Sequence, residues 1–307
     1  MIYVFLIFWI LSAVLMVFEN KVTRILIYLG IFSLITSVCF LLFRAPDVAM
    51  AEAAISTFST ILFIICFEKY YNLKGSSPSG LQTGSRFLIK SIIPILFSVF
   101  LFAVFIMSLP EGTANSYLKD QYVSMFSHDI GGENAVTAIY LGYRMYDTLF
   151  EALMLLVSVV AVAHLSFYSE TAEGKGEQSD ITRSAIGSFT IRMITPLILV
   201  FGIYLIMNGH FSPGGGFQGG VALASFFVCR YLIYDIYDTK ADKIFIMEKI
   251  IFSVIILLPV LFIFLGVYYY FPQYRNAYLV IMNTLIGMKV CCGFMVIFYR
   301  YIAFEKR

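Results

Sequence analysis

Charged residues are scarce in this sequence. Asp, Glu, Lys and Arg together make up 13% of its 307 residues, against about 25% in soluble domains. Hydrophobic residues make up 60%, and the mean hydropathy is +0.87. The net charge of +2 is small and the basic residues are scattered, which argues against a nucleic-acid partner. The composition excludes an ordinary soluble domain and predicts an all-α, polytopic membrane protein.

Cysteine and histidine are also few. No cysteine has CxxC or Cys/His spacing, and all five stand in apolar stretches. We interpret them as small apolar residues that form neither disulfides nor metal sites. We therefore expect no metal, no cofactor and no catalytic residue. The first 18 residues lack the basic leader and the small-residue cleavage site of a signal peptide, so we expect them to form a mature span.

Long apolar runs dominate what is present. Runs of about 20 apolar residues predict membrane-spanning helices. Nine such spans are expected, at 2–18, 23–43, 46–67, 87–108, 146–168, 188–207, 217–237, 244–266 and 277–299. Polar linkers at 69–86 and 169–183 divide them into groups of three, two and four.

The distribution of Lys and Arg predicts the orientation of these spans. Loops on the cytoplasmic side carry an excess of basic residues. With the N-terminus outside and the C-terminus inside, sixteen of the 21 basic residues fall on the cytoplasmic side and three on the external side. The asymmetry supports both nine spans and this orientation, in a multi-pass protein of the cell membrane.

One stretch, Asn208 to Gly220, interrupts two apolar runs with the sequence NGHFSPGGGFQGG. Proline and consecutive glycines cannot continue a helix, so we expect a turn formed by Pro213, Gly214, Gly215 and Gly216. After it, Gly216, Gly220 and Ala224 share one helical face, the small-residue spacing that lets membrane helices pack closely. The pattern GxGxxG within it is no nucleotide fingerprint, because both flanks are membrane spans.

Acidic residues occur inside the third expected span. Asp47 follows Pro46 in its first turn, where it can complement the helix dipole or belong to an ion path. Glu52 lies roughly 7.5 Å deeper, beyond any capping position. It shares a face with Ser56, Ser59 and Thr60, and we interpret it as an ion-path residue, the alternative being a structural ion pair.

More ionisable residues lie in the later spans. Arg144, Asp147 and Glu151 occupy one flank of the fifth span, where two carboxylates one turn apart can share a proton or hold a cation. A salt bridge that only orients the helix is the alternative for Arg144 and Asp147. His210 precedes the turn on the predicted external side. Lys289 stands halfway along the ninth span, too deep to reach water easily, and needs a carboxylate, carbonyl groups or water beside it.

Three motifs now resemble known membrane subunits. The segment APDVAMAEAA, with the helices before it, resembles the MbhD-like (DUF4040) part near the C-terminus of MrpA, the large subunit of Mrp antiporters. The segment NAVTAIYLGYRMYDTLFE resembles the MbhE-like part that follows it. The stretch from Thr195 to Val228, with GHFSPGGGFQGG, resembles the MrpB subunit, also called MnhB, or MbhF in membrane-bound hydrogenases.

The resemblance implies a subunit of a cation/proton-translocating complex. It implies three domains, at 1–75, 85–170 and 185–307. The expected partners are other membrane subunits, Na⁺ or H⁺, and the lipid bilayer, and no nucleic acid is expected. The first five spans are also similar to the J-type subunit of respiratory complex I, in which the third helix can carry a π-bulge. Two positions depart from the family: Gly142 stands where Asp is usual, and Met145 where Gly is usual.

Two functional hypotheses follow. In the first, the chain is a non-catalytic subunit of an ion-translocating complex, with Asp47, Glu52, Arg144, Asp147, Glu151, His210 and Lys289 along the ion path. In the second, its charges only align helices, and the chain is an assembly subunit in the membrane arm of a hydrogenase or related redox-driven pump. A stand-alone enzyme has little support, because no soluble domain or nucleophile-base pair is visible.

Overall fold

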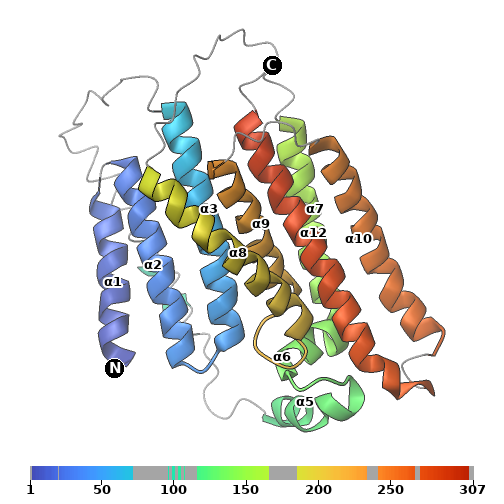
Figure 1. The fold of residues 1–307 in the computed structure, drawn as a ribbon. Coiled ribbons are helices and arrows are strands. Elements are labelled where there is room, and N and C mark those ends of the chain that lie inside the picture. The colour runs from blue at the N-terminus through green and yellow to red at the C-terminus, as the bar shows by residue number, and fades with distance from the viewer. Residues whose placement is uncertain are drawn as a thin grey trace. The chain divides into compact units, whose positions relative to one another are not determined.

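The computed structural model describes residues 2–19, 21–71, 116–165, 185–233, 241–266 and 270–303, with a few isolated positions between 96 and 107. The chain divides into two compact units. The first comprises Met1–Phe67 and Met125–Arg307, and the second Glu68–Ser124. Every regular element in the described ranges is helical, which confirms the all-α prediction for them (Figure 1).

The described part of the chain forms twelve helical elements. Two of them, α3 (Pro46–Tyr71) and α5 (Ser116–Asp129), cross the boundary between the units. The others are α1 (Ile2–Phe18), α2 (Val22–Leu42), α6 (Ala135–Ala138), the π-helix η2 (Ile139–Tyr143), α7 (Met145–Leu165), α8 (Ala185–Asn208), α9 (Gly216–Ile233), α10 (Ala241–Phe264), the 3₁₀-helix η3 (Pro272–Tyr274) and α12 (Arg275–Ala303).

Six of the described helices are long and apolar enough to cross a membrane. They comprise Val22–Leu42, Pro46–Phe67, Met145–Leu165, Ala185–Asn208, Lys243–Phe264 and Pro272–Tyr301. The shorter helices α1 and α9 lie where the first and seventh spans are expected. The span expected at 87–108 and the two polar linkers lie almost wholly outside the described residues. The protein is therefore a multi-pass membrane protein, while the count of nine spans and the orientation stay predictions.

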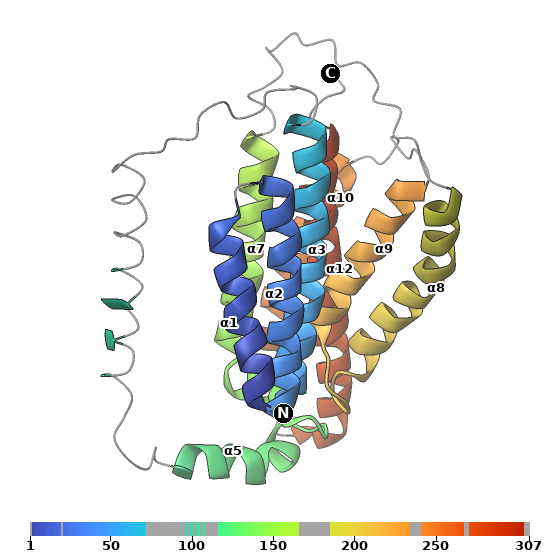
Figure 2. The same ribbon diagram turned by 90° about the vertical axis from the view of Figure 1, so that its left-hand side faces the viewer.

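Helix α12 is the centre of the first unit. In the most apolar stretch of this helix 61% of the residues are buried, against at most 22% in the corresponding stretches of the other five span-length helices. It packs against α7, α8, α9 and α10, and α8 and α9 lie side by side (Figure 2). A membrane helix can stay hydrophobic on all faces, and contacts with neighbouring helices rather than hydropathy decide which one becomes central.

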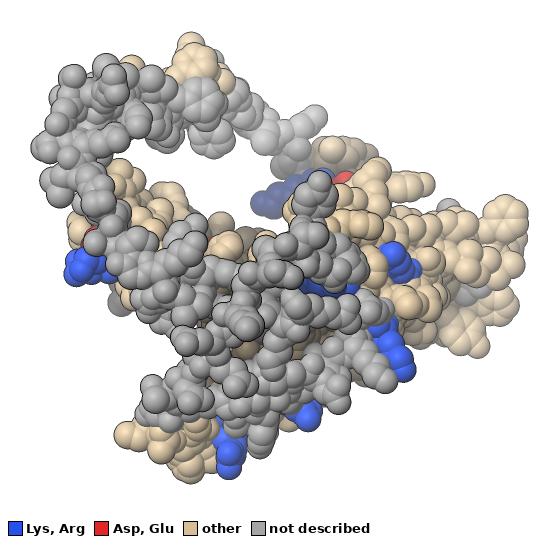
Figure 3. Space-filling model, turned by 90° about the horizontal axis from the view of Figure 1, so that it is seen from above, with Lys and Arg blue, Asp and Glu red and all other residues tan. Residues whose placement is uncertain are grey.

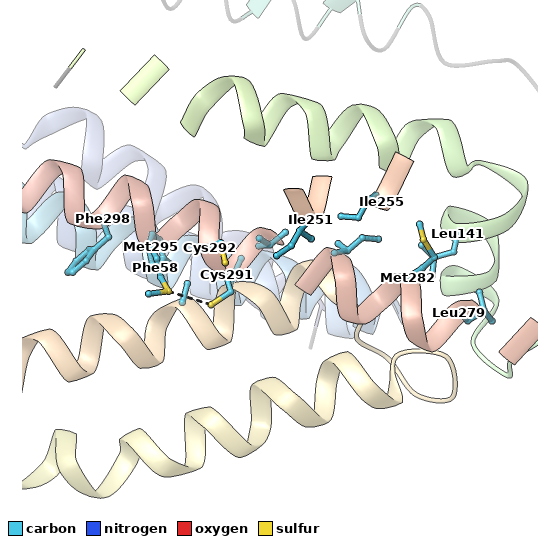
Figure 4. Close-up of a cluster of buried hydrophobic side chains, with 14 of the residues drawn as sticks. Phe58, Leu141, Ile251, Ile255, Leu279, Met282, Cys291, Cys292, Met295 and Phe298 are labelled. Atoms are coloured by element: carbon cyan, nitrogen blue, oxygen red, sulfur yellow. Dashed lines mark hydrogen bonds between the residues drawn. The ribbon is translucent and has the colours of Figure 1, made fainter. Parts of the chain in front are cut away.

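The apolar core gathers around α12 (Figure 4). The Phe58 ring of α3 meets the Phe294 ring of α12 edge to face, with 4.7 Å between their centroids. Ile251 and Ile255 of α10 and Leu141 of η2 are buried in the same cluster. Lipid tails are as apolar as these side chains, so close packing and polar contacts, more than water exclusion, must hold such helices together.

A sharp turn between α2 and α3 brings an acidic residue to the start of α3. Arg44 has φ of 59°, a left-handed conformation that often ends a helix. The Ala45 amide donates to the Phe40 carbonyl at 2.9 Å, which satisfies one of the last carbonyl groups of α2. Pro46 then opens α3, and Asp47 stands in its first turn. The position of Asp47 thus follows from local backbone geometry.

Candidate functional site

The connection between α8 and α9 is the glycine-rich stretch. Helix α8 ends at Asn208 and α9 begins at Gly216, so Pro213, Gly214 and Gly215 lie in the connection. Gly214 and Gly215 have φ of +143° and +148°, a region that L side chains rarely adopt. A Cβ atom on Gly215 would lie 2.3 Å from the Tyr140 hydroxyl. Only glycine fits at this position.

After the turn, small residues bring α9 against α12. A Cβ atom added to Gly216 would lie 2.6 Å from the Asn283 carbonyl oxygen, and one added to Gly220 would lie 2.6 Å from the Gly287 carbonyl oxygen. Ala224, on the same face, is fully buried. The two backbones thus approach too closely for any side chain at the glycine positions, as the small-residue spacing predicts.

Hydrogen bonds of Asp47 connect the start of α3 to the glycine-rich turn. Its Oδ1 atom accepts a hydrogen bond from the Gly214 amide at 3.0 Å and another from the Asn134 side-chain amide at 3.1 Å. Its main-chain carbonyl accepts from Gln218 Nε2 at 3.4 Å. The residue is only 8% exposed. Asp47 therefore joins three segments that lie far apart in the sequence, besides standing in the first turn of its helix.

Asn134 is the second anchor of the turn. Its side-chain oxygen caps α6 by accepting from the Val136 amide at 3.0 Å. Its Nδ2 atom lies within 3.2 Å of the carbonyl oxygens of both Gly209 and Ser212, in addition to Asp47. One buried amide side chain therefore contacts both sides of the turn and the acidic residue of α3.

Further polar groups extend this contact toward α12. Thr137 donates to the Gly209 carbonyl at 2.6 Å, and its Oγ1 atom lies 3.4 Å from the Tyr140 hydroxyl. The Tyr140 hydroxyl donates to Asn283 Oδ1 at 2.9 Å, and the Gly216 amide donates to the same oxygen at 3.2 Å. We call these five buried or partly buried side chains the turn network: Asp47, Asn134, Thr137, Tyr140 and Asn283.

His210 supports the turn network through its main chain. Its carbonyl accepts from the amides of Glu133 and Asn134 at 2.8 and 3.0 Å. The side chain is only 7% exposed and its ring lies beside that of Phe211, with 4.1 Å between centroids. The Nδ1 atom is buried and has no hydrogen-bond partner within the described ranges.

Glu52 lies one to two turns beyond Asp47 and is half-buried. It forms no ion pair with another described residue. The hydroxyls of Ser56, Thr57 and Ser59 donate to carbonyls four residues back in α3. Hydroxyls that donate in this way keep their free lone pairs as acceptors. Beside them, a cavity of about 180 Å³ between α2 and α3 is lined by Ser56, Thr57 and Thr60 among others. The hydroxyl groups on this flank of α3 are therefore available mainly as acceptors.

The acidic flank of α7 faces away from the centre of the unit. Arg144 and Asp147 form an ion pair between side chains that are 64% and 53% exposed. Glu151, one turn further on, is also exposed and pairs with no described residue. The structure thus shows an ion pair between Arg144 and Asp147 and brings neither Glu52 nor Lys289 to Glu151.

A π-helix precedes this flank. Tyr140 lies in η2, and its carbonyl accepts a hydrogen bond from the Thr148 hydroxyl at 2.6 Å. The J-type subunit that the first five spans resemble can carry a π-bulge in its third helix. In this structure α3 is a regular α-helix, and the π-helix η2 directly precedes α7. Gly142 packs against Ile130, whose side chain would lie 2.6 Å from an added Cβ atom. A carboxylate at position 142 has no room in this arrangement.

Lys289 has the carboxylate partner that its depth requires. Its Nζ atom lies 3.0 Å from Glu248 Oε1 and donates to the Ala152 carbonyl at 2.6 Å. Neither Lys289 nor Glu248 is exposed at all. Sequence reasoning missed Glu248. One sequence feature could have identified it: Glu248 is an acidic residue inside the apolar run at 244–266, and this run directly precedes the span that carries Lys289.

A second cavity, of about 540 Å³, lies near the turn and is lined by Gly132, Glu133, Phe211, Arg275 and Asn276 among others. Close to it, the Tyr143 hydroxyl donates to Asp129 Oδ2 at 2.8 Å, and His128 Nδ1 lies 3.2 Å from Asp129 Oδ1. These hydrogen bonds, that of Tyr143 first, lower the pKa of Asp129. Nowhere in the described ranges do three His, Cys, Asp or Glu side chains gather as a metal site requires.

The fold and these buried charges define a helical membrane domain that holds ionisable side chains between its helices. Residues 186–299 match a family described as a domain related to the MnhB subunit of Na⁺/H⁺ antiporter. Residues 7–71 match the MbhD family, described as a subunit of MBH. Two parts of the chain therefore match an MbhD model and an MnhB-related model, which confirms the resemblance for these two parts. The MbhE-like interpretation of the segment between them stays a prediction.

Curated relatives agree with this assignment. The A subunit of the Na⁺/H⁺ antiporter from Bacillus subtilis (strain 168) is 28% identical over 162 residues, which cover 52% of this chain and 18% of that protein. The chain thus spans about a fifth of the length of the curated relatives it matches.

Two solved structures share the fold. The Mrp complex from Dietzia sp. DQ12-45-1b matches 97% of this chain and 34% of its own chain, with a TM-score of 0.75 and 16% identity. A chain of the membrane-bound sulfane sulfur reductase (MBS), an archaeal respiratory membrane complex, is matched over 96% of its length and 69% of this chain. Its TM-score is 0.57 and its identity 25%.

Proposed function

We propose that this protein is a non-catalytic membrane subunit of a multi-subunit complex that exchanges or translocates cations and protons. The supporting observation is the set of ionisable side chains held within span-length helices, namely Glu52, Glu151, Glu248 and Lys289. Each costs roughly 2.5 to 3.5 kcal/mol near the centre of a bilayer on insertion scales, and such residues usually mark ion or proton paths. The similarity to Na⁺/H⁺ antiporter subunits supports Na⁺ and H⁺ as the ions that use this path.

The geometry favours different roles for the seven predicted path residues. Glu52 and Glu151 have no ionic partner in the described part of the chain and are the groups available to a cation or proton. Arg144 and Asp147 form an exposed ion pair at the start of α7. Asp47 and His210 shape the entrance through the glycine-rich turn, and Lys289 belongs to a closed internal pair.

The proposal includes the predicted topology of nine spans with the N-terminus outside, and domains at 1–75, 85–170 and 185–307. Seen from the end where α7 and α12 finish, the described surface shows Lys and Arg side chains and little Asp or Glu (Figure 3). The excess of Lys and Arg among the described residues at this end supports its assignment to the cytoplasmic side of the cell membrane.

Glutamine substitutions test the proposal. Glu52→Gln and Glu151→Gln keep size and hydrogen-bonding capacity but remove the charge. We expect each variant to assemble with its partner subunits and to lose Na⁺-dependent proton movement in membrane vesicles. Glu19→Gln, which changes a carboxylate in the connection between α1 and α2, is the matched control. Full transport per assembled complex in Glu52→Gln would remove Glu52 from the path.

A second candidate function is supported by the likeness to the sulfane sulfur reductase chain, which this protein matches over 96% of that chain. In this alternative, the protein is an assembly subunit in the membrane arm of a membrane-bound hydrogenase or related redox-driven pump. The same glutamine variants would then lower the yield of assembled complex and leave the transport per complex unchanged.

A further inference from the structure

The pair formed by Glu248 and Lys289 lies where three helices meet. Glu248 comes from α10, Lys289 from α12, and the Ala152 carbonyl that accepts from Lys289 belongs to α7. Glu248 stands seven residues from the start of α10, roughly 10 Å along the axis. Lys289 stands fourteen residues from either end of α12 and reaches both partners with its long side chain. The pair therefore occupies the interior of the unit.

The carboxylate of this pair is poorly satisfied. Both oxygens of Glu248 are buried, and neither receives a hydrogen bond of good geometry from a described residue. The charge of Lys289 at 3.0 Å is its main stabilisation. A buried ion pair adds stability only when further hydrogen bonds satisfy the remaining polar atoms of both partners. The carboxylate of Asp47 receives two such hydrogen bonds, whereas the carboxylate of Glu248 receives none from a described residue. The pair is therefore poorly suited to serve only as a structural brace.

Such a pair has a second state of the same net charge. If the proton on Lys289 Nζ moves to a Glu248 oxygen, an N–H bond breaks, an O–H bond forms, and the nitrogen keeps the lone pair. Both side chains are then neutral, and the lysine amine can still donate to the Ala152 carbonyl. Because the interior disfavours separated charges, the neutral state competes with the ionic one.

We propose that Glu248 is a proton-exchanging residue that takes a proton from Lys289 and returns it during the transport cycle. This inference rests on the proposed function and adds a residue to it. The lysine contacts the carbonyl of Ala152, which directly follows Glu151 on α7, so α7 connects the internal pair to the exposed acidic flank. The titratable groups that interact with Glu248 in the described structure are Lys289 and the Cys292 thiol, both on α12.

Substitutions separate proton exchange from a purely structural role. Lys289→Arg keeps the positive charge beside Glu248, but a guanidinium does not release its proton in proteins. The double variant Glu248→Gln/Lys289→Met removes both charges and leaves no ion unpaired. We expect the double variant to assemble like wild type and to lose Na⁺-dependent proton movement by about tenfold or more, since a positioned proton-transfer group typically contributes at least that much.

The single variants Glu248→Gln and Lys289→Met each leave one buried charge unpaired, so we expect them to assemble poorly. If the double variant assembles and transports like wild type, the proton-exchange role is overturned. If Lys289→Arg assembles and transports like wild type, the pair is structural and the inference is equally overturned.

Infrared difference spectroscopy of the assembled complex provides a readout that does not require transport. Wild type should show the carbonyl-stretch band of a protonated carboxyl group, because the neutral state of the pair places the proton on Glu248, and this band should be absent from the double variant. Identical spectra in the two complexes would show that Glu248 never takes the proton. If wild type moves no ions but shows the Glu248 band, the proposed function fails while the protonation of Glu248 stands.

Discussion

Replacing Asp47 is the most informative test of how the three segments of the chain are held together. Its carboxylate accepts two buried hydrogen bonds, from the Gly214 amide and from Asn134. Hydrogen bonds to a charged group contribute about 1.5–3 kcal/mol each, so Asp47→Ala should cost roughly 3–6 kcal/mol. Native proteins have a total stability of only about 5–15 kcal/mol. We therefore expect a severe loss of assembled complex.

The conservative variant separates anchoring from ion binding. Asp47→Asn keeps an oxygen that can accept from both donors, but neutral hydrogen bonds are roughly half as strong as charge-assisted ones. We expect a cost of about 1.5–3 kcal/mol and a complex that assembles in part and still transports ions. Size-exclusion chromatography after heating measures stability, and vesicle assays measure transport per complex.

Asp120→Ala, which removes an exposed carboxylate from α5, is the control for these measurements and should behave like wild type. An Asp47→Asn complex that is as stable as wild type but inactive would refute the anchoring role and make Asp47 an ion ligand. An Asp47→Ala complex of full stability would show that the two hydrogen bonds contribute far less than expected.

Three further changes test other parts of the structure. Gly220→Leu should separate α9 from α12 and abolish assembly, whereas Gly187→Leu, placed in α8 away from this contact, should assemble normally; the yield of purified complex distinguishes them. Thr148→Val removes the hydroxyl that satisfies the Tyr140 carbonyl in the π-helix, and should lower stability by about 1–3 kcal/mol in thermal unfolding, because a buried acceptor is left unpaired. Tyr143→Phe removes the hydrogen bond that contributes most to the lowered pKa of Asp129. Since a depressed carboxyl pKa stabilises the folded state at pH above the unfolded pKa and this stabilisation is lost as pH falls, the variant should lose stability at neutral pH and match wild type in strong acid. Equal losses at all pH values would contradict this explanation.

Much of the fold could be predicted from hydropathy alone. Helices in the described ranges lie where eight of the nine spans were expected, because each run of apolar residues must satisfy its backbone groups internally. The break at Asn208–Gly220 and the close face formed by Gly216 and Gly220 follow from residue types that permit few other structures. These features are local, and local sequence determines them.

The contacts that complete the site depend on long-range geometry. Asp47 and Gly214 are 167 residues apart, and Asn134 lies between them in sequence, so no spacing rule connects the three. Lys289 was predicted to need a partner, but hydropathy does not say which face of α10 turns toward α12, and Glu248 was missed. The position of the π-helix could not be predicted, because an extra residue in a helical turn leaves no mark in the apolar pattern.

The proposed transport function requires that ions and protons reach the acidic residues of this protein. The most direct measurement is Na⁺-dependent proton movement by the purified complex in sealed liposomes, followed with a pH-sensitive dye and normalised to the amount of complex. We predict that wild type collapses an imposed pH gradient when Na⁺ is added and that Glu52→Gln/Glu151→Gln does not. Equal responses from the two complexes would contradict the proposed ion path.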